Sequence, residues 1–470
     1  MLLNDTIIAL ATPQGAGAIA ILRISGKDAI PLTASLFESI KGKNLIDQAS
    51  HTLVLGHIID EGRTIDQVLV SIFKNPYSYT GEDVIEVSCH GSPYIQQEIL
   101  QLFVKNGCRL ADPGEFTLRA FLNGKLDLSQ AEAVADLIAS DSKASHQLAI
   151  AQMRGGFSSE IEELRQELLN FASLIELELD FSEEDVDFAD RAAFQTLIDT
   201  ISRVLKRLIE SFAFGNVLKN GIPVAIIGEP NVGKSTLLNS LLNEDKAIVS
   251  DIAGTTRDTI EDEIVLNGVS YRFIDTAGIR ETQDLIENIG IKKTYEASAK
   301  AQLILFLFDV SQSYAAPTKL HESQLQHVQA EIKKIQTQFP DKKIRVVANK
   351  SDLVPTNQLD QLKKELPDAL FISAKDQSGI ELLKKELTNL INTGALSNNQ
   401  SIVSNSRHFE ALNLALESIN AVQYGIDQEI SSDLIAIDIR AALAHLGAIT
   451  GKVTNEDLLG NIFANFCIGK

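Results

Sequence analysis

The run from Gly228 to Thr236, GEPNVGKST, combines residue types and a spacing that can bind phosphate. It fits G-x-x-x-x-G-K-[ST], in which the glycines let the backbone curl so that successive N–H groups point at phosphate oxygens. Lys234 would reach the β- and γ-phosphates, and the Ser235 hydroxyl would ligate Mg²⁺. The expected nucleotide contacts in this run are Asn231, Val232, Gly233, Lys234, Ser235 and Thr236.

The segments on either side of this run predict the structure that the motif requires. The preceding apolar run, Pro223 to Ile227, is typical of a short buried strand, and Leu237 to Leu242 indicates the start of an amphipathic helix. A strand, a glycine-rich loop and a helix N-terminus in this order direct N–H groups and a partial positive charge at one point. The sequence therefore predicts a phosphate-binding loop.

A second group of residues specifies the base. Asn349-Lys350-Ser351-Asp352 follows the apolar run Ile344 to Ala348, and an Asp in this position can accept hydrogen bonds from both N1–H and the exocyclic amino group of guanine. Adenine lacks that pair of donors and would leave the carboxylate unpaired. Ser373-Ala374-Lys375, after the expected strand Ala369 to Ile372, fits a loop that closes over the base. The sequence therefore predicts GTP rather than ATP.

A third group of residues suits the γ-phosphate. Asp275-Thr276-Ala277-Gly278 follows the expected strand Tyr271 to Ile274. Asp275 would hold Mg²⁺ through water, and the Gly278 N–H could meet the γ-phosphate. Thr255 and Thr256, in the run GTTRD, are switch candidates. Five such elements in the right order, most of them directly after an expected strand, predict a GTP-binding domain.

Ile279 occupies the position after that motif, where many GTPases have a Gln that orients the attacking water. Its side chain can neither donate nor accept a hydrogen bond, so either hydrolysis is slow or a downstream carboxylate does this work. The candidates are Glu281, Asp284 and Glu287. Arg257 and Arg280 are more simply explained as solvated switch-loop charges than as arginine fingers. A monovalent cation could supply the missing positive charge, and Asn231 offers it a side-chain carbonyl.

The composition limits the class of protein. A chain of 470 residues predicts about three domains. The net charge of −21 argues against a globally basic nucleic-acid binder, so RNA contact would need a local patch or a basic partner. Cys89, Cys108 and Cys467 have no paired or zinc-type spacing, which favours a reducing, cytoplasmic location. The N-terminal run lacks a secretory pattern, and no apolar stretch, Leu303 to Val310 included, reaches membrane-spanning length.

Changes in periodicity along the chain predict a multidomain protein. Residues 1–125 alternate short β runs with turns, which indicates an α+β domain. Residues 126–219 and 391–470 show helical spacing of apolar residues and predict one all-α domain. Residues 220–390 alternate strands and helices, which predicts a P-loop α/β G domain inserted into the helical one. The acidic run Asp180 to Asp190 favours a solvated loop over a metal site. The expected N-terminal strands are Thr6–Ala11, Ala18–Ile24, Gln67–Phe73 and Asp83–Cys89.

Further runs, at both ends of the chain, carry a resemblance to a known family. They are DTI at Asp5, LRISG at Leu22, YTGED at Tyr79, PGEF at Pro113 and RAFLNGKLD at Arg119, together with the ending Cys467-Ile468-Gly469-Lys470. With these runs, with GTTRD and with the apolar residue after Asp-Thr-Ala-Gly, the chain resembles the tRNA-modification GTPase family called MnmE or TrmE over nearly its whole length.

The resemblance implies a folate site and a homodimer in the N-terminal domain. The family binds 5-formyltetrahydrofolate there, and its contacts correspond to Arg23, Glu86, Lys125 and Lys470. This set is chemically sensible, because the pterin offers donors to a carboxylate and the glutamate tail offers carboxylates to Arg and Lys. Glu82 is close enough in sequence to be the contact in place of Glu86.

The resemblance also implies the ligands of the G domain, which in the family dimerises face to face around K⁺. The Mg²⁺ ligands correspond to Ser235 and Thr256, and the K⁺ ligands to Asn231, Ser250, Ile252 and Thr255. The nucleotide-contacting loop corresponds to Ser250, Asp251, Ile252, Ala253, Gly254, Thr255 and Thr256. The water-positioning glutamate corresponds to Glu287. The family's C-terminal cysteine, whose chemical role we leave open, corresponds to Cys467.

The reaction implied by the resemblance takes place at the wobble uridine of certain tRNAs. In a heterotetramer with a flavin-dependent partner, MnmG (also called GidA), the family adds an aminomethyl or carboxymethylaminomethyl group at C5. The folate is the one-carbon source or scaffold, and GTP hydrolysis gates the complex. The acidic charge fits a protein that contacts tRNA mainly through its partner.

Two other functions are compatible with the G domain alone. One is a GTP-dependent assembly switch for ribosomes or other RNA, without modification chemistry, and the other is a GTP-dependent small-molecule enzyme. A pure switch needs neither residues 1–125 nor the C-I-G-K ending, and these features favour the modification pathway.

Overall fold

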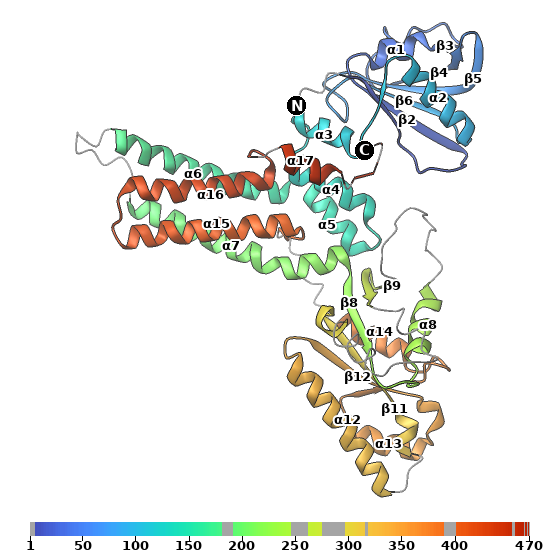
Figure 1. Cartoon of the computed structure of the whole chain (residues 1–470), viewed down its shortest axis with the longest axis vertical. Helices are drawn as coiled ribbons and strands as arrows, with labels where there is room; N and C mark the ends of the chain where they lie inside the picture. Colours follow the sequence, from blue (N-terminus) through green and yellow to red (C-terminus); the bar gives the residue numbers. More distant parts are fainter. Residues whose placement is uncertain are drawn as a thin grey trace. The chain divides into compact units, whose positions relative to one another are not determined.

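The structure is a computed structural model of the chain (Figure 1). It describes residues 5–180, 191–245, 262–274, 297–314, 318–389, 401–453, 456–464, 466, 467 and 469. The chain forms two compact units. Unit 1 contains residues 1–139, 149–209 and 407–470, and unit 2 contains residues 140–148 and 210–406.

Unit 1 begins with a seven-stranded sheet of order β3-β4-β5-β6-β2-β1-β7, in which only β1 and β7 pair in parallel. Its strands alternate buried apolar residues with more exposed ones, which leaves one apolar face to cover. The helices α1 (Ala29–Ser35) and α2 (Pro93–Lys105) cover that face through side chains such as Ile30 and Phe103. The strands are β1 (Ile7–Leu10), β2 (Ile19–Ser25), β3 (Phe37–Ser39), β4 (Thr52–Asp60), β5 (Arg63–Phe73), β6 (Val84–His90) and β7 (Arg109–Leu110).

The rest of unit 1 is helical, and its helices come from both sides of the nucleotide motifs. In Figure 1, α6 lies beside α16 and α7 beside α15. The ring of Phe171 in α6 stacks on that of Phe194 in α7 with centroids 3.9 Å apart, and Gln195 donates to Gln423 at 2.6 Å. The helices are α3 (Glu115–Leu122), α4 (Leu128–Ala139), α5 (Lys143–Met153), α6 (Gly156–Asp180), α7 (Arg191–Asn220), α15 (Ser406–Asp427), α16 (Ser432–Thr450) and α17 (Glu456–Phe463). The helices α5 and α7 continue into unit 2.

Unit 2 contains a six-stranded sheet of order β13-β12-β11-β8-β10-β9, parallel except for β9. Every residue of the central strand β11 is buried, and successive side chains enter the two apolar clusters on opposite faces of the sheet. The strands are β8 (Ile222–Ile227), β9 (Asp262–Leu266), β10 (Val269–Phe273), β11 (Leu303–Asp309), β12 (Lys343–Asn349) and β13 (Ala369–Phe371).

Helices cover both faces of this sheet. Leucines of α8 and α14 belong to one cluster, and Ile335 of α12 and Leu362 of α13 belong to the other. Because parallel strands end at the same edge, the residues that follow β8, β11, β12 and β13 lie together at that edge. The helical segments are α8 (Lys234–Asp245), α11 (Val310–Tyr314), α12 (Thr318–Gln338), η3 (Ser351–Leu353), α13 (Thr356–Glu365) and α14 (Ile380–Asn389).

The fold class expected from the sequence is confirmed: an α+β N-terminal part, a helical part, and a P-loop α/β part. Each expected strand is present. The apolar run Leu303 to Val310, which is typical of a buried strand, forms β11 as far as Asp309, and Val310 begins α11. The strands β3, β4, β7 and β9 were not expected. The dipeptide Asn267-Gly268 connects β9 to β10 and is the signal that was missed. Both residues have a positive φ, 49° and 82°, as in a tight hairpin turn. The acidic run from residue 181 to 190 lies outside the described residues.

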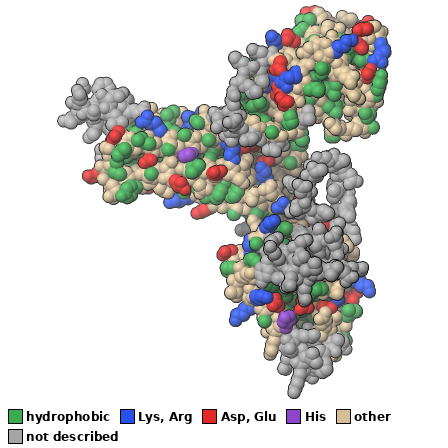
Figure 2. Space-filling view, viewed as in Figure 1, with side chains coloured by type: hydrophobic (Ala, Val, Ile, Leu, Met, Phe, Trp, Pro, Cys, Tyr) green, Lys and Arg blue, Asp and Glu red, His purple; other side chains and the backbone are tan. Residues whose placement is uncertain are grey.

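The surface of the described residues carries charges of both signs. On the face shown in Figure 2, basic side chains lie among acidic and apolar ones in both units. Across the described part of the chain, none of the helices has the length and apolar character needed to cross a bilayer.

Candidate functional sites

The phosphate loop connects β8 to α8 and depends on two glycines. Gly228 has a φ of 151°, and a Cβ there would lie 2.0 Å from the carbonyl oxygen of Leu307. Gly233 has a φ of 100°, and a Cβ there would lie 2.3 Å from Nδ2 of Asn349. Neither position can carry a side chain without displacing its neighbour. The loop therefore curls as the sequence motif predicts.

Lys234 lies inside this curl. Its Nζ donates hydrogen bonds to the carbonyl oxygens of Gly228, at 2.7 Å, and Glu229, at 2.9 Å. Burial lowers the pKa of Lys234, and the Glu229 carboxylate opposes this shift only in part. The ammonium is thus held at the mouth of the loop, where it can exchange loop carbonyls for phosphate oxygens. Asn231 is exposed in a left-handed conformation (φ 62°), and Ser235 lies half-buried in the first turn of α8.

The expected base-recognition loop begins at Asn349, the last residue of β12. Asn349 is 2% exposed; its Nδ2 donates to the carbonyl oxygen of Val232 at 2.8 Å, and its Oδ1 accepts from the backbone N of Ala374 at 2.9 Å. This side chain joins the phosphate loop to the two segments expected around the base. Asp352, which follows in η3, is exposed, as is Lys375. The structure thus brings three of the sequence elements to one sheet edge.

Sequence reasoning missed Asp309 at the same edge. Asp309 ends β11, and one of its carboxylate oxygens lies 2.7 Å from Nζ of Lys350. The signal available in the sequence was an Asp that closes an entirely apolar run. Its partner becomes evident only when β11 and β12 are known to be neighbours.

Several expected residues lie outside the described part of the chain. In the nucleotide site these are Ser250, Asp251, Ile252, Ala253, Gly254, Thr255, Thr256, Asp275, Thr276, Ala277 and Gly278. The same holds for Ile279, for Arg257 and Arg280, for the candidate carboxylates Glu281, Asp284 and Glu287, and for Lys470. These expectations remain predictions.

A second candidate site lies on the N-terminal sheet, where Arg23 of β2 and Glu86 of β6 are register partners. Nε of Arg23 donates to Oε1 of Glu86 at 2.9 Å, and both side chains are partly exposed. The guanidinium lies 5.4 Å from the ring centroid of Tyr79 and 5.8 Å from that of Phe116, within cation–π range. The Phe116 ring is buried, so the group offers a ligand a cation, an anion and the partly buried ring of Tyr79, which suits a planar ligand with a charged tail.

Segments near the C-terminus of the chain reach this site. Arg23 lies 3.5 Å from the carbonyl oxygen of Gly469, and the backbone N of Gly114 donates to the carbonyl oxygen of Cys467 at 3.4 Å. The Cys467 thiol is exposed. Cys89 and Cys108 are buried, and burial raises the pKa of their thiols to about 11 and about 12. Of the three cysteines, Cys467 therefore has the environment most compatible with reactivity.

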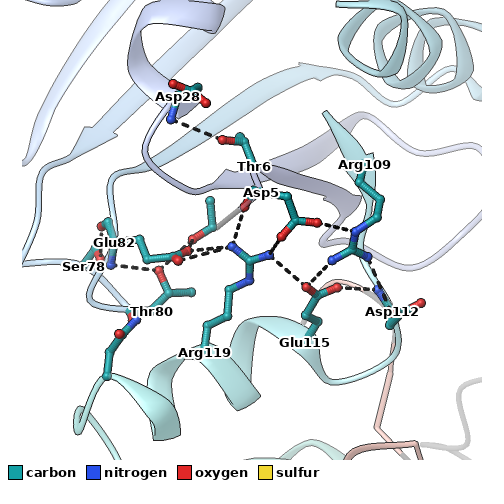
Figure 3. A network of polar contacts seen from close by, with 12 residues as sticks. Asp5, Thr6, Asp28, Ser78, Thr80, Glu82, Arg109, Asp112, Glu115 and Arg119 are labelled. Carbon is teal, nitrogen blue, oxygen red and sulfur yellow. Dashed lines mark hydrogen bonds and ion pairs between the residues drawn. The ribbon is translucent and has the colours of Figure 1, made fainter. Parts of the chain in front are cut away.

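The alternative residue Glu82 has a different environment (Figure 3). Its carboxylate accepts from NH1 of Arg119 at 3.2 Å and from Oγ of Ser25 at 2.6 Å. Arg119 is 1% exposed and also donates to Asp5 and Glu115 at 2.8 and 2.9 Å. Glu82 is thus part of a network around the buried Arg119 that holds the N-terminal segment to α3. Sequence reasoning missed this network, which has no local signature.

Lys125 is exposed and donates from Nζ to the carbonyl oxygen of Pro76 at 3.0 Å. Its side chain also passes Gly81, where a Cβ would lie 3.2 Å from Cγ of Lys125. The ammonium is free to reorient toward a carboxylate, because one exposed contact to a carbonyl holds it weakly.

Comparisons with known proteins cover the whole chain. A family model described as the MnmE helical domain matches residues 128–467, and one described as the GTP-binding protein TrmE N-terminus matches residues 6–125. The chain is 61% identical to the tRNA modification GTPase MnmE of Flavobacterium psychrophilum, over 100% of both chains. It is 61% identical to the protein of that name from Flavobacterium johnsoniae, again over 100% of both, and 53% identical to the one from Bacteroides thetaiotaomicron, over 99% and 100%.

Among solved structures, the G domain of the T. maritima FeoB iron transporter is similar to part of the chain. The two are 22% identical, the match covers 36% of this chain and 97% of that one, and the TM-score is 0.25.

Proposed function

Since the chain belongs to the MnmE family of tRNA modification GTPases, we propose that it couples GTP hydrolysis to modification of the wobble uridine in certain tRNAs. The chain is a GTP hydrolase of that family. In the proposed reaction it acts with a flavin-dependent partner of the MnmG (GidA) type. Together they add an aminomethyl or carboxymethylaminomethyl group at C5 of the uridine.

The observation that carries this proposal is the match over the full length of both chains, at 61% identity, to a tRNA modification GTPase. A GTP-dependent switch without modification chemistry would share the phosphate and base loops but has no need of the N-terminal sheet. The Arg23–Glu86 group on that sheet, with the chain's last residues beside it, supports a second ligand besides the nucleotide.

The proposed nucleotide site consists of the phosphate loop and the two segments expected around the base, which the Asn349 side chain joins. The cradle formed by Gly228 and Gly233 has no room for a Cβ, which fits a loop whose N–H groups face phosphate. Lys234 would neutralise charge on the phosphates, and Asp352 would accept from guanine. Ser235 and Thr256 would hold Mg²⁺, which supplies charge neutralisation between the β- and γ-phosphates.

The proposed hydrolysis step depends on residues outside the described part of the chain. By family resemblance, Glu287 would hold the attacking water, and Asn231, Ser250, Ile252 and Thr255 would hold K⁺ between two G domains. Hydrolysis should then be faster in potassium than in sodium salts, and equal rates would contradict the K⁺ site. Glu287→Ala should lower turnover and leave GTP affinity nearly unchanged, and a loss confined to binding would refute its role.

The N-terminal sheet is the proposed site for 5-formyltetrahydrofolate and the proposed homodimer contact. Lys125 and Lys470 would hold the carboxylates of the glutamate tail, and Arg23, which is paired with Glu86, would contact the folate beside that residue. Glu86 is the proposed acceptor for the pterin, because its partner Arg23 lies beside the ring of Tyr79, whereas Glu82 accepts from the buried Arg119 and from Ser25. The net charge of −21 supports tRNA contact mainly through the partner subunit of a heterotetramer.

Reconstitution tests the proposal directly. The purified chain, its flavin-dependent partner, the folate and an unmodified tRNA transcript should yield C5-modified uridine with GTP. A non-hydrolysable GTP analogue should give none. Equal product with both nucleotides would contradict the coupling to hydrolysis. GTP hydrolysis without any modified nucleoside, under conditions in which a known homologous pair is active, would favour the assembly-switch function.

A further inference from the structure

The carboxylate of Asp309 is placed beside the base-recognition loop and is fully engaged. Asp309 is the register partner of Asn349, at the point where β11 and β12 both end. Its Oδ2 accepts from Nζ of Lys350 at 2.7 Å. Its Oδ1 accepts from the backbone N of Ser311 at 3.0 Å and from the Ser311 hydroxyl at 2.6 Å. The side chain is 6% exposed, so these contacts replace most of its hydration.

The charge of Asp309 is maintained in this environment. Burial raises its pKa, but the Lys350 ammonium and the two Ser311 donors outweigh burial and lower the pKa below the ordinary value. The carboxylate is therefore ionised at neutral pH. A buried anion that faces one ammonium fixes the direction of the lysine side chain more firmly than a surface pair does.

The backbone of Lys350 adopts a conformation that a lysine rarely adopts, so its surroundings must hold it in place. Its φ is 63°, in the left-handed region, and it is the N-cap residue of the short helix η3, which contains Asp352. A non-glycine residue in this region costs free energy and persists only where its surroundings hold it. The ion pair with Asp309 is such a restraint, and it acts on the residue two positions before the expected base-reading carboxylate.

We propose that Asp309 is a positioning residue for guanine nucleotide recognition. By holding Nζ of Lys350, it fixes the aliphatic stem of that lysine and the turn that presents Asp352 before the nucleotide binds. The loop is then already ordered when the nucleotide binds. Binding does not carry the entropic cost of ordering the loop, and the affinity is higher. This inference rests on the proposed role of the segment from Asn349 to Asp352 in binding the base.

Because Asp309 is proposed to act through Lys350, the losses of nucleotide affinity caused by substituting the two residues should not add. Asp309→Asn keeps the size of the side chain and an oxygen for Ser311, but removes the charge that holds Lys350. Lys350→Met keeps the apolar stem and removes the ammonium. If the two residues act as one unit, the double variant should bind nucleotide no more weakly than Lys350→Met alone. A purely structural role for Asp309 would not produce this non-additivity in nucleotide affinity.

The experiment measures the Kd for a fluorescent GDP and the kcat and KM for GTP, using the full chain. Asp309→Asn should raise the Kd and KM about tenfold, which is the loss expected for one charge-assisted contact, and change kcat less than about twofold. The matched control is Asp360→Asn, an exposed carboxylate of α13 that lies 3.9 Å from Lys363 in the same unit. This control should leave all three constants unchanged.

Two outcomes would overturn the inference. One is a Kd for Asp309→Asn within twofold of the unsubstituted chain, and the other is a double variant whose loss equals the product of the single losses. If Asp309→Asn fails to fold, Ser311→Ala removes the hydroxyl contact to the carboxylate and should raise the Kd two- to threefold, with an unchanged Kd refuting the role. Failure of the unsubstituted chain to bind GDP would instead contradict the proposed nucleotide site itself.

Discussion

The side-chain amide of Asn349 donates a hydrogen bond to the carbonyl oxygen of Val232, 2.8 Å away and 117 positions earlier in the chain. The same side chain accepts a hydrogen bond from the backbone N of Ala374. One buried residue therefore joins the phosphate loop to the two segments expected around the base. A substitution at Asn349 should therefore affect both the phosphate contacts and the base contacts of the nucleotide.

Asn349→Ala should weaken GTP binding at least about tenfold and lower the thermal midpoint of unfolding. The substitution leaves the Val232 carbonyl and the Ala374 N–H without their partner, at a cost of about 1–3 kcal/mol for each buried group. Equilibrium binding and thermal unfolding of the full chain measure the two effects. Asn357→Ala, at an exposed position of α13, is the matched control and should change neither. Wild-type affinity in Asn349→Ala would show that the three segments do not depend on this link.

The sequence predicted those parts of the nucleotide site whose signal is a short motif, and missed the part that depends on residues far apart in the chain. The phosphate loop and the Asn349–Asp352 loop were predictable, because each is a short motif directly after an apolar strand. Asp309 was not, because its role depends on Lys350, which lies 41 positions later and reaches it only through strand pairing.

The fold also contains an element whose signal depends on residues outside its own segment. The strand β4 was missed because its pattern is interrupted by Gly56, where a Cβ would lie 2.3 Å from both the Glu38 carbonyl oxygen and the Phe37 ring. A glycine required by close packing of a neighbouring strand resembles a turn signal when only the sequence is considered.

Gly233→Ala should abolish measurable GTP binding. The added methyl group would lie 2.3 Å from Nδ2 of Asn349, at a φ of 100° that an alanine rarely adopts. Both effects open the phosphate loop and break its link to the base loop. Gly156→Ala is the control, since Gly156 is helical, exposed and has no atom within 4 Å of the added Cβ. Isothermal calorimetry distinguishes the two variants, and retained GTP binding in Gly233→Ala would contradict the geometry described here.

Arg23→Ala should weaken binding of 5-formyltetrahydrofolate at least about tenfold and leave GTP affinity unchanged. The substitution removes the cation that faces Glu86, Tyr79 and the Gly469 carbonyl, whereas the nucleotide loops belong to unit 2. Arg63→Ala is the matched control on the same sheet, because Arg63 is an exposed arginine paired with Glu98. Isothermal calorimetry measures the affinity for the folate. Equal folate affinity in both variants would place the folate site elsewhere.

Glu132→Gln should change how stability depends on pH. Glu132 is buried in α4 and contacts Arg407 at 2.8 Å and His408 at 2.7 Å. Burial alone would raise its pKa, but His408 and Arg407 lower the pKa to about 2 from an ordinary value of 4.5. Because the folded-state pKa is lowered, the carboxylate stabilises the fold above about pH 4.5, and this contribution is lost as the pH falls toward 2.

The free energy of unfolding should therefore fall more steeply between pH 4.5 and 2 in the unsubstituted chain than in Glu132→Gln. Near pH 7 the variant should be less stable by about 3 kcal/mol, because one partner of a buried ion pair is removed. Since the chain has no tryptophan, urea unfolding followed by far-UV circular dichroism is the suitable measurement. Glu163→Gln, an exposed position on α6, should behave as the unsubstituted chain. Parallel pH profiles for Glu132→Gln and the unsubstituted chain would refute the electrostatic account.

Nucleoside mass spectrometry of bulk tRNA shows directly whether this chain takes part in modifying the wobble uridine. In a strain that lacks the gene, the 5-aminomethyl-type uridines should disappear. The intact gene should restore them, whereas a gene encoding Gly233→Ala should not. An unchanged nucleoside profile in the deletion strain would contradict a role in tRNA modification and leave the GTP-dependent assembly switch as the function to test.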